Sequence, residues 1–182
     1  MTPLRSFLRA ETNELHRDLD DLIGPLASPS DYGRFLAGTY RHRAAVEAAL
    51  RETCVSLPLG WRPRELASVL ELDLAELGVH RPRAMPFSLS NDIASVLGAS
   101  YVLEGSALGA RVLVRDALRL GFEADRGARY LSAQSASPET WRDFLACLES
   151  LGRADWNRAA DSARQVFSHA IQAFSSEKLP AA

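Results

Sequence analysis

Apolar residues recur along this chain at helical intervals, and no segment shows the sustained apolar–polar alternation of a half-buried strand. A hydroxyl residue followed by proline marks helix starts at Thr2, Ser28 and Ser137, and Gly24 and Gly121 mark helix ends. The pattern predicts an all-α chain with helices over residues 3–22, 29–55, 63–77, 90–104, 106–120, 123–134, 138–151 and 154–176.

The stretch from Ile93 to Leu120 is strongly apolar and helical in rhythm, yet it contains Gly98, Gly105 and Gly109. Each glycine inside a helix costs about 0.5–1 kcal/mol relative to alanine. Gly105 and Gly109 are four residues apart, so they share a face and leave a patch without side chains. A close helix crossing or a kink is the simpler interpretation of this spacing, and a surface for a flat molecule is the alternative.

The first predicted helix has an apolar stripe with a polar flank. The stripe consists of Leu4, Leu8, Leu15, Leu19 and Leu22. Arg9 and His16 lie on the flank with Thr12 between them, and the two outer residues point the same way about 10 Å apart. An imidazole and a cation at this separation suit a flat metal cofactor that carries carboxylates, although an isolated pair is more often a solvated surface.

Other metal chemistries find less support among the four histidines. None follows a glutamate by three residues, as a di-iron helical bundle requires, and none has the two-histidine spacing of a zinc site. His42 lies between Arg41 and Arg43, which predicts a solvated face. His80 falls in a connection, and His169 on the last helix is either packed or exposed.

Composition indicates one ordinary globular domain over residues 1–182, with a loose tail over 175–182. The net charge of −2 and the scattered basic residues argue against a nucleic-acid partner. Cys54 and Cys147 have no paired spacing, so both are interpreted as buried small hydrophobic residues, while a single disulfide stays open.

Membrane insertion and secretion are also disfavoured. The first residues lack the long apolar core of a signal peptide, and Glu104, Ser106 and Arg111 interrupt the apolar run around Val102. We therefore expect a cytoplasmic protein that does not use a membrane.

Three segments, Leu8–His16, Tyr101–Arg111 and Ala163–Phe174, occur in an order and at a spacing that span nearly the whole chain. Together they resemble the haem oxygenases, especially the bacterial branch found beside bacteriophytochromes. The first is similar to the proximal helix that ends in the axial ligand, and the second to the glycine-bearing distal helix. The third is similar to the last core helix, whose aromatic residue contacts the cofactor.

The resemblance implies an all-α helical bundle with haem, as substrate and cofactor, between a proximal and a distal helix. It implies a haem oxygenase that converts haem to biliverdin, carbon monoxide and iron. O2, an external electron donor of the ferredoxin or flavoprotein type, and a bacteriophytochrome that receives biliverdin are the implied partners. The implied metal ligand is His16, the other haem contacts are Arg9, Thr12, Arg142 and Phe167, and the implied catalytic residues are Gly105, Ser106 and Gly109.

The chain also departs from the better-known branches of this family. Ser106 stands where they have a distal aspartate, Ala110 where they have a second adjacent glycine, and Ala146 where they have an arginine. Glu104 lies about 100° round the helix from Gly105, so we expect it to point away from the ligand. Proton delivery then falls to Ser106, the backbone and water.

Two other functions stay open at this stage. The missing distal aspartate suggests a non-catalytic haem-binding or haem-carrying protein on the same scaffold. A thiaminase-like enzyme with Cys147 as nucleophile would share the fold, but no acidic cluster or base lies obviously near that cysteine.

Overall fold

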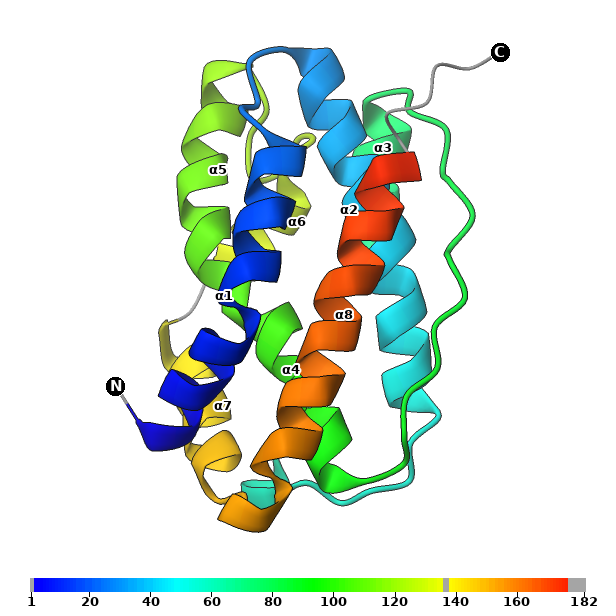
Figure 1. Cartoon of the computed structure of the whole chain (residues 1–182). Coiled ribbons are helices and arrows are strands. Elements are labelled where there is room, and N and C mark those ends of the chain that lie inside the picture. Colours follow the sequence, from blue (N-terminus) through cyan, green and yellow to red (C-terminus); the bar gives the residue numbers. More distant parts are fainter. Residues whose placement is uncertain (1, 136–137, 177–182) are drawn as a thin grey trace.

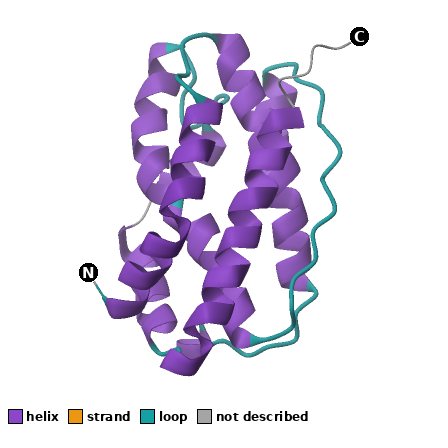
Figure 2. Ribbon diagram, in the orientation of Figure 1, coloured by secondary structure: helices purple, strands orange, loops and turns teal. Residues whose placement is uncertain are grey.

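The computed structural model describes residues 2–135 and 138–176, and within these ranges every regular element is a helix (Figures 1 and 2). The α-helices are α1 (Pro3–Ile23), α2 (Pro29–Arg51), α3 (Ala67–Glu76), α4 (Ile93–Gly105), α5 (Ala107–Arg119), α6 (Arg129–Ser135), α7 (Pro138–Glu149) and α8 (Trp156–Ser176). Two short 3₁₀ helices are η1 (Pro58–Gly60) and η2 (Arg153–Asp155). The all-α prediction is confirmed.

Helix α8 lies at the centre of the packing, where it contacts α1, α2 and α4 (Figure 1). Its buried face is rich in small residues, so neighbouring helices approach closely. A Cβ added at Gly98 of α4 would lie 2.8 Å from the carbonyl carbon of Ala159 on α8. The close helix crossing that the glycine pattern suggested therefore belongs to Gly98.

Helices α4 and α5 follow each other with a break at Ser106. Within the described part of the chain, Ile93–Arg119 is the one stretch long and apolar enough to cross a membrane, with a mean hydropathy of 1.3 in its best window. The expectation that its polar residues make it a poor span is therefore not supported by composition. However, 67% of that window is buried inside the protein, as in a core helix.

Three helix boundaries differ from the predicted ones by four residues or more. Helix α2 ends at Arg51 rather than at residue 55, α3 begins at Ala67 rather than at 63, and α6 begins at Arg129 rather than at 123. Helix α8 ends at Ser176, as the predicted helix over 154–176 does, and residues 177–182 of the predicted loose tail lie outside the described residues.

Two expectations about polar residues are wrong. His42 is buried, and its Nδ1 lies 2.9 Å from Nδ1 of buried His169, because α8 covers this face of α2. Cys54 is exposed, whereas Cys147 is buried as expected. Both cysteines are free, which excludes the disulfide that the sequence left open.

Candidate functional site

His16 projects from α1 with one ring nitrogen already engaged. Its side chain is 60% exposed, and Nδ1 lies 2.9 Å from Oδ2 of Asp20, one turn further along the helix. A carboxylate at Nδ1 favours the tautomer in which the Nε2 lone pair is free to bind a metal. The Phe167 ring of α8 lies 5.7 Å from the imidazole, between ring centroids, and flanks it. The structure thus brings together two of the predicted site residues.

Arg9 lies on the same helix, is exposed, and acts electrostatically on Tyr101 of α4. Burial raises the pKa of Tyr101 on α4, and the nearby guanidiniums of Arg5 and Arg9 oppose that rise. Thr12 behaves differently, since it is only 3% exposed and its hydroxyl donates to the carbonyl of Leu8 at 2.8 Å. The expectation that Thr12 shares the exposed flank of Arg9 and His16 is therefore wrong.

Trp141 of α7 contacts residues of both α1 and α4. The guanidinium of Arg5 lies 5.4 Å from the centroid of its indole, and the ring of Tyr101 lies 6.3 Å from it. A Cβ added at Gly105 would lie 3.8 Å from Cη2 of Trp141. Arg142 follows Trp141 on α7 and is exposed, so its positive charge is accessible from solvent next to Trp141.

Gly105 and Gly109 do not mark a close helix crossing. Trp141 is the sole neighbour that an added Cβ at Gly105 would meet within 4 Å among the described residues. Apart from its own helix backbone and chain neighbours, a Cβ at Gly109 would meet no described atom within that distance. The kink that the simpler interpretation allowed is present, because α4 and α5 meet at Ser106 beside Gly105. The backbone between these glycines is also accessible to a flat ligand, as the alternative interpretation of the spacing required.

Ser106 and Glu104, the neighbours of Gly105, are both engaged in polar contacts, although Ser106 is exposed and Glu104 is buried. The Ser106 hydroxyl donates to the carbonyl of Leu103 at 2.7 Å and accepts from Nε2 of Gln134 at 2.8 Å. Glu104 is 1% exposed, and its carboxylate accepts from Nε of Arg64 at 2.8 Å. The hydroxyl hydrogen of Ser106 and the carboxylate of Glu104 are therefore both engaged by partners within the protein.

Two hollows in the surface lie away from these residues. One of about 420 Å³ includes Trp61 and Arg51 in its lining, and the other, of about 310 Å³, is formed in part by Ile23 and Phe174. None of the predicted site residues lines either hollow. The candidate site is therefore defined by residue chemistry and the open glycine face, and these hollows are no part of it.

Comparison with known proteins identifies the family. No protein-family model matches the chain. The chain is 32% identical over 165 residues to Heme oxygenase PigA of Pseudomonas aeruginosa, an alignment that covers 86% of this chain and 83% of that protein. This chain belongs to the haem oxygenase family. A heme oxygenase of Xanthomonas campestris pv. campestris is 31% identical over 155 residues, which cover 82% of this chain and 92% of that protein.

The fold agrees with this haem oxygenase assignment. A solved structure, the NO- and CO-bound heme oxygenase of Neisseria meningitidis, superposes with a TM-score of 0.77 at 22% identity. The superposition covers 97% of this chain and 92% of that one. The resemblance stated from three short segments is thus confirmed for family and fold.

Sequence reasoning missed two residues of the site in this family member. Asp20 carried a usable signal, because a carboxylate four residues after a histidine lies on the same helix face. The position of Trp141 between Arg5 and Gly105 carried none, since α1, α4 and α7 meet only in the folded chain.

Proposed function

We propose that this haem oxygenase binds haem between α1 and the α4–α5 break and opens it to biliverdin, carbon monoxide and iron, using O2 and an external reductant. The relationship to Heme oxygenase PigA over most of both chains supports the reaction. The arrangement of His16 and Asp20 supports the ligand, because it leaves one imidazole nitrogen of an exposed histidine available.

His16 would be the only protein ligand of the iron. Bound haem supplies the iron at which O2 reacts and is itself the molecule oxidised, so it is both cofactor and substrate. A thiolate ligand would donate more electron density to iron and so favour O–O cleavage over attack on the porphyrin edge. A neutral imidazole donates less, so it suits a reaction at the porphyrin edge. Phe167, packed beside the ring of His16, would limit its rotation. Thr12, buried beneath the flank, would support the pocket through packing.

Gly105 and Gly109 would provide space and backbone polar groups on the distal side. Because their face carries no side chain, O2 and water have room there, and backbone amides and carbonyls can position them. Ser106 would act by holding this backbone, since its hydroxyl is bonded to Leu103 and Gln134. Glu104 would take no direct part, because Arg64 holds its carboxylate inside the protein.

Arg9 and Arg142 would hold the two haem propionates. Guanidinium–carboxylate hydrogen bonds are charge-assisted and geometrically specific, so they would set the rotation of the ring. The rotation of the haem ring in its pocket would decide which meso carbon reacts with O2.

The remaining assignments belong to the same proposal. The chain would form one domain over residues 1–182, act in the cytoplasm and receive electrons from a ferredoxin or flavoprotein. A bacteriophytochrome would accept the biliverdin. The two alternative functions lose support. The thiaminase-like enzyme needs Cys147 as a nucleophile, but burial raises the pKa of the Cys147 thiol and so disfavours the thiolate. A haem carrier would lack the reaction attributed to this family.

An aerobic reaction of the haem complex with ascorbate tests the proposal. We expect the wild-type protein to form biliverdin, and His16→Ala to lose the histidine-ligated spectrum and most turnover while it stays folded. His80→Ala, at an exposed position in a connection, is the matched control and should match the wild type. A wild-type protein that binds haem but never opens the ring would instead be a haem carrier. A His16→Ala variant with unchanged spectrum and turnover would refute the ligand assignment.

A further inference from the structure

The break between α4 and α5 is closed by side chains. In an unbroken helix the carbonyl of Leu103 accepts from the N–H of Ala107. At this break it accepts from the hydroxyl of Ser106 at 2.7 Å and from Nε2 of Gln134 at 2.8 Å. The same Nε2 donates to the Ser106 hydroxyl at 2.8 Å. One side-chain amide of α6 thus binds both polar groups at the break.

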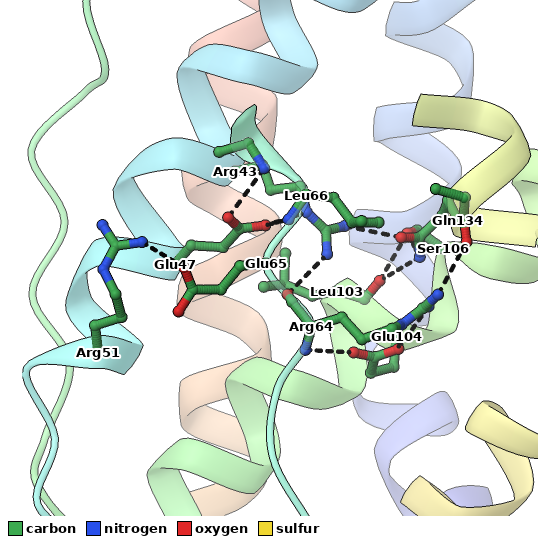
Figure 3. A network of polar contacts seen from close by, with 12 residues as sticks. Arg43, Glu47, Arg51, Arg64, Glu65, Leu66, Leu103, Glu104, Ser106 and Gln134 are labelled. Carbon is green, nitrogen blue, oxygen red and sulfur yellow. Dashed lines mark hydrogen bonds and ion pairs between the residues drawn. The ribbon is translucent and has the colours of Figure 1, made fainter. Parts of the chain in front are cut away.

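The amide oxygen of Gln134 is also hydrogen-bonded. Oε1 accepts from Nη1 of Arg43 at 3.1 Å, and both side chains are 1% exposed (Figure 3). Arg43 is in turn paired with buried Glu47 on the same helix. Because a flipped amide would turn its N–H groups towards a guanidinium, which has only donors, the orientation of Gln134 is fixed. Gln134 is therefore a rigid link from α2 to the break.

Glu104 is anchored on the same inner side. Its carboxylate accepts from the backbone N–H of Arg64 at 3.3 Å and lies 2.7 Å from Nη2 of that residue. Arg64 also donates to the carbonyl of Ala133 on α6 at 3.1 Å. Both neighbours of Gly105, at the edge of the Gly105–Gly109 face, are thus bonded to other parts of the fold. The position of that face depends on contacts made behind it.

We infer that Gln134 is a positioning residue of the distal helix: its amide fixes the break at Ser106 and thereby the place of the Gly105–Gly109 backbone over the substrate. This inference rests on the proposed function, in which that face covers haem. No contact of Gln134 with haem is implied. Its influence passes through Leu103 and Ser106, whose polar groups it binds.

Amide hydrogen exchange in the haem-free full chain tests whether Gln134 holds the break. Gln134→Met removes the amide at similar volume, and Gln134→Glu keeps the acceptor for Arg43 but loses both donors. We expect exchange over residues 103–110 to be about tenfold faster in either variant, the change that loss of a buried hydrogen bond brings to local opening. If Gln134→Met does not fold, Gln134→Glu decides the test.

Ser162→Ala is the matched control. It removes a buried hydrogen bond of 2.7 Å from α8 to the carbonyl of Ser95 on α4, away from the break. Exchange over 103–110 should stay at the wild-type rate in this variant. Equal acceleration in Ser162→Ala and the Gln134 variants, or unchanged exchange in the latter, would overturn the inference.

The haem complex supplies the functional readouts. We expect the Gln134 variants to shift the pH at which water on the ferric iron deprotonates and to change the ratio of biliverdin isomers, while Ser162→Ala changes neither. Faster exchange with both readouts at wild-type values would reduce Gln134 to a structural residue and refute the inference. A wild-type protein that forms no biliverdin refutes the proposed function instead, while the exchange data still report whether Gln134 holds the break.

Discussion

Among single residues, Asp20 has the most direct influence on the proposed ligand His16. The carboxylate lies 2.9 Å from Nδ1 and strengthens the imidazole as a donor to iron through its negative charge. Asp20→Asn keeps the size but leaves only a neutral acceptor. We predict that haem affinity falls up to about tenfold and that the iron–histidine stretching frequency decreases. Haem titration and resonance Raman spectroscopy of the ferrous complex measure the two effects.

Asp18→Asn is the control for this prediction, because Asp18 is an exposed acid on the same helix and His16 is paired with Asp20. It should leave both quantities unchanged. An Asp20→Asn variant with the wild-type stretching frequency would show that this carboxylate does not tune the ligand.

What the sequence reveals of a residue depends on whether its partner is local. The axial candidate His16 and its partner Asp20 lie one turn apart, so helical spacing predicts the pair. His42 has arginines on either side, which suggested solvent, yet its partner is His169 on another helix. Arg43 is likewise buried, because Glu47 and Gln134 neutralise and bind it. The burial of such groups depends on partners far away in the sequence, which a short segment does not include.

At the level of helices, the glycines of α4 and α5 predict opposite responses to an added side chain. Gly98→Ala would place Cβ against the carbonyl of Ala159, so we expect the haem-free protein to lose about 1–3 kcal/mol of stability. Gly109→Ala meets no described atom within 4 Å and removes a flexible residue from a helix. It should gain up to about 1 kcal/mol. Urea unfolding of the haem-free chain measures both changes.

The functional side of this prediction uses a larger residue. Gly109→Leu should leave the haem-free protein folded while it displaces haem or blocks O2, so that turnover falls much more than stability. Unfolding of Gly109→Leu, or normal turnover, would show that this face does not lie over the substrate. A stable Gly98→Ala would show that α4 and α8 can separate at their crossing.

Helix existence was predictable from periodicity, whereas two helix starts were not. The start of α3 is delayed to Ala67 because the preceding segment reaches α2, where Glu47 accepts from the backbone N–H groups of Leu66 and Ala67 at 2.8 and 3.0 Å. The start of α6 is bound by Asp73, a residue of α3 that accepts from the N–H of Tyr130 at 2.8 Å. Both boundaries depend on carboxylates from other helices.

For the whole molecule, the His42–His169 pair joins distant parts of the chain. Helices α2 and α8 meet at these rings. The long connection before α4 runs along this side of the fold (Figure 1), and its Phe87 packs edge-on against His169, with 5.1 Å between the ring centroids. Burial, the neighbouring His169 and Arg43 lower the pKa of His42 to about 3. Burial also lowers the pKa of His169, against the opposing effect of the Met85 and Pro86 carbonyls. Both rings are therefore neutral in the folded protein at neutral pH.

The pair predicts how stability depends on pH. In the unfolded chain each histidine binds a proton near pH 6.5, whereas in the folded chain it does so only at lower pH. The unfolded state thus takes up more protons as the pH falls, so the contribution of the pair is complete above pH 6.5 and is lost below it. His42 alone should lower the unfolding free energy by about 2 kcal/mol between pH 7 and pH 5.

His42→Gln, which stays neutral, should remove that part of the slope of unfolding free energy against pH, and exposed His80→Gln should retain it. Urea unfolding of the haem-free chain at pH 7, 6 and 5 gives the slopes, and this window largely avoids the titration of the carboxylates. An unchanged slope in His42→Gln would mean that the pair ionises alike in the folded and unfolded chains.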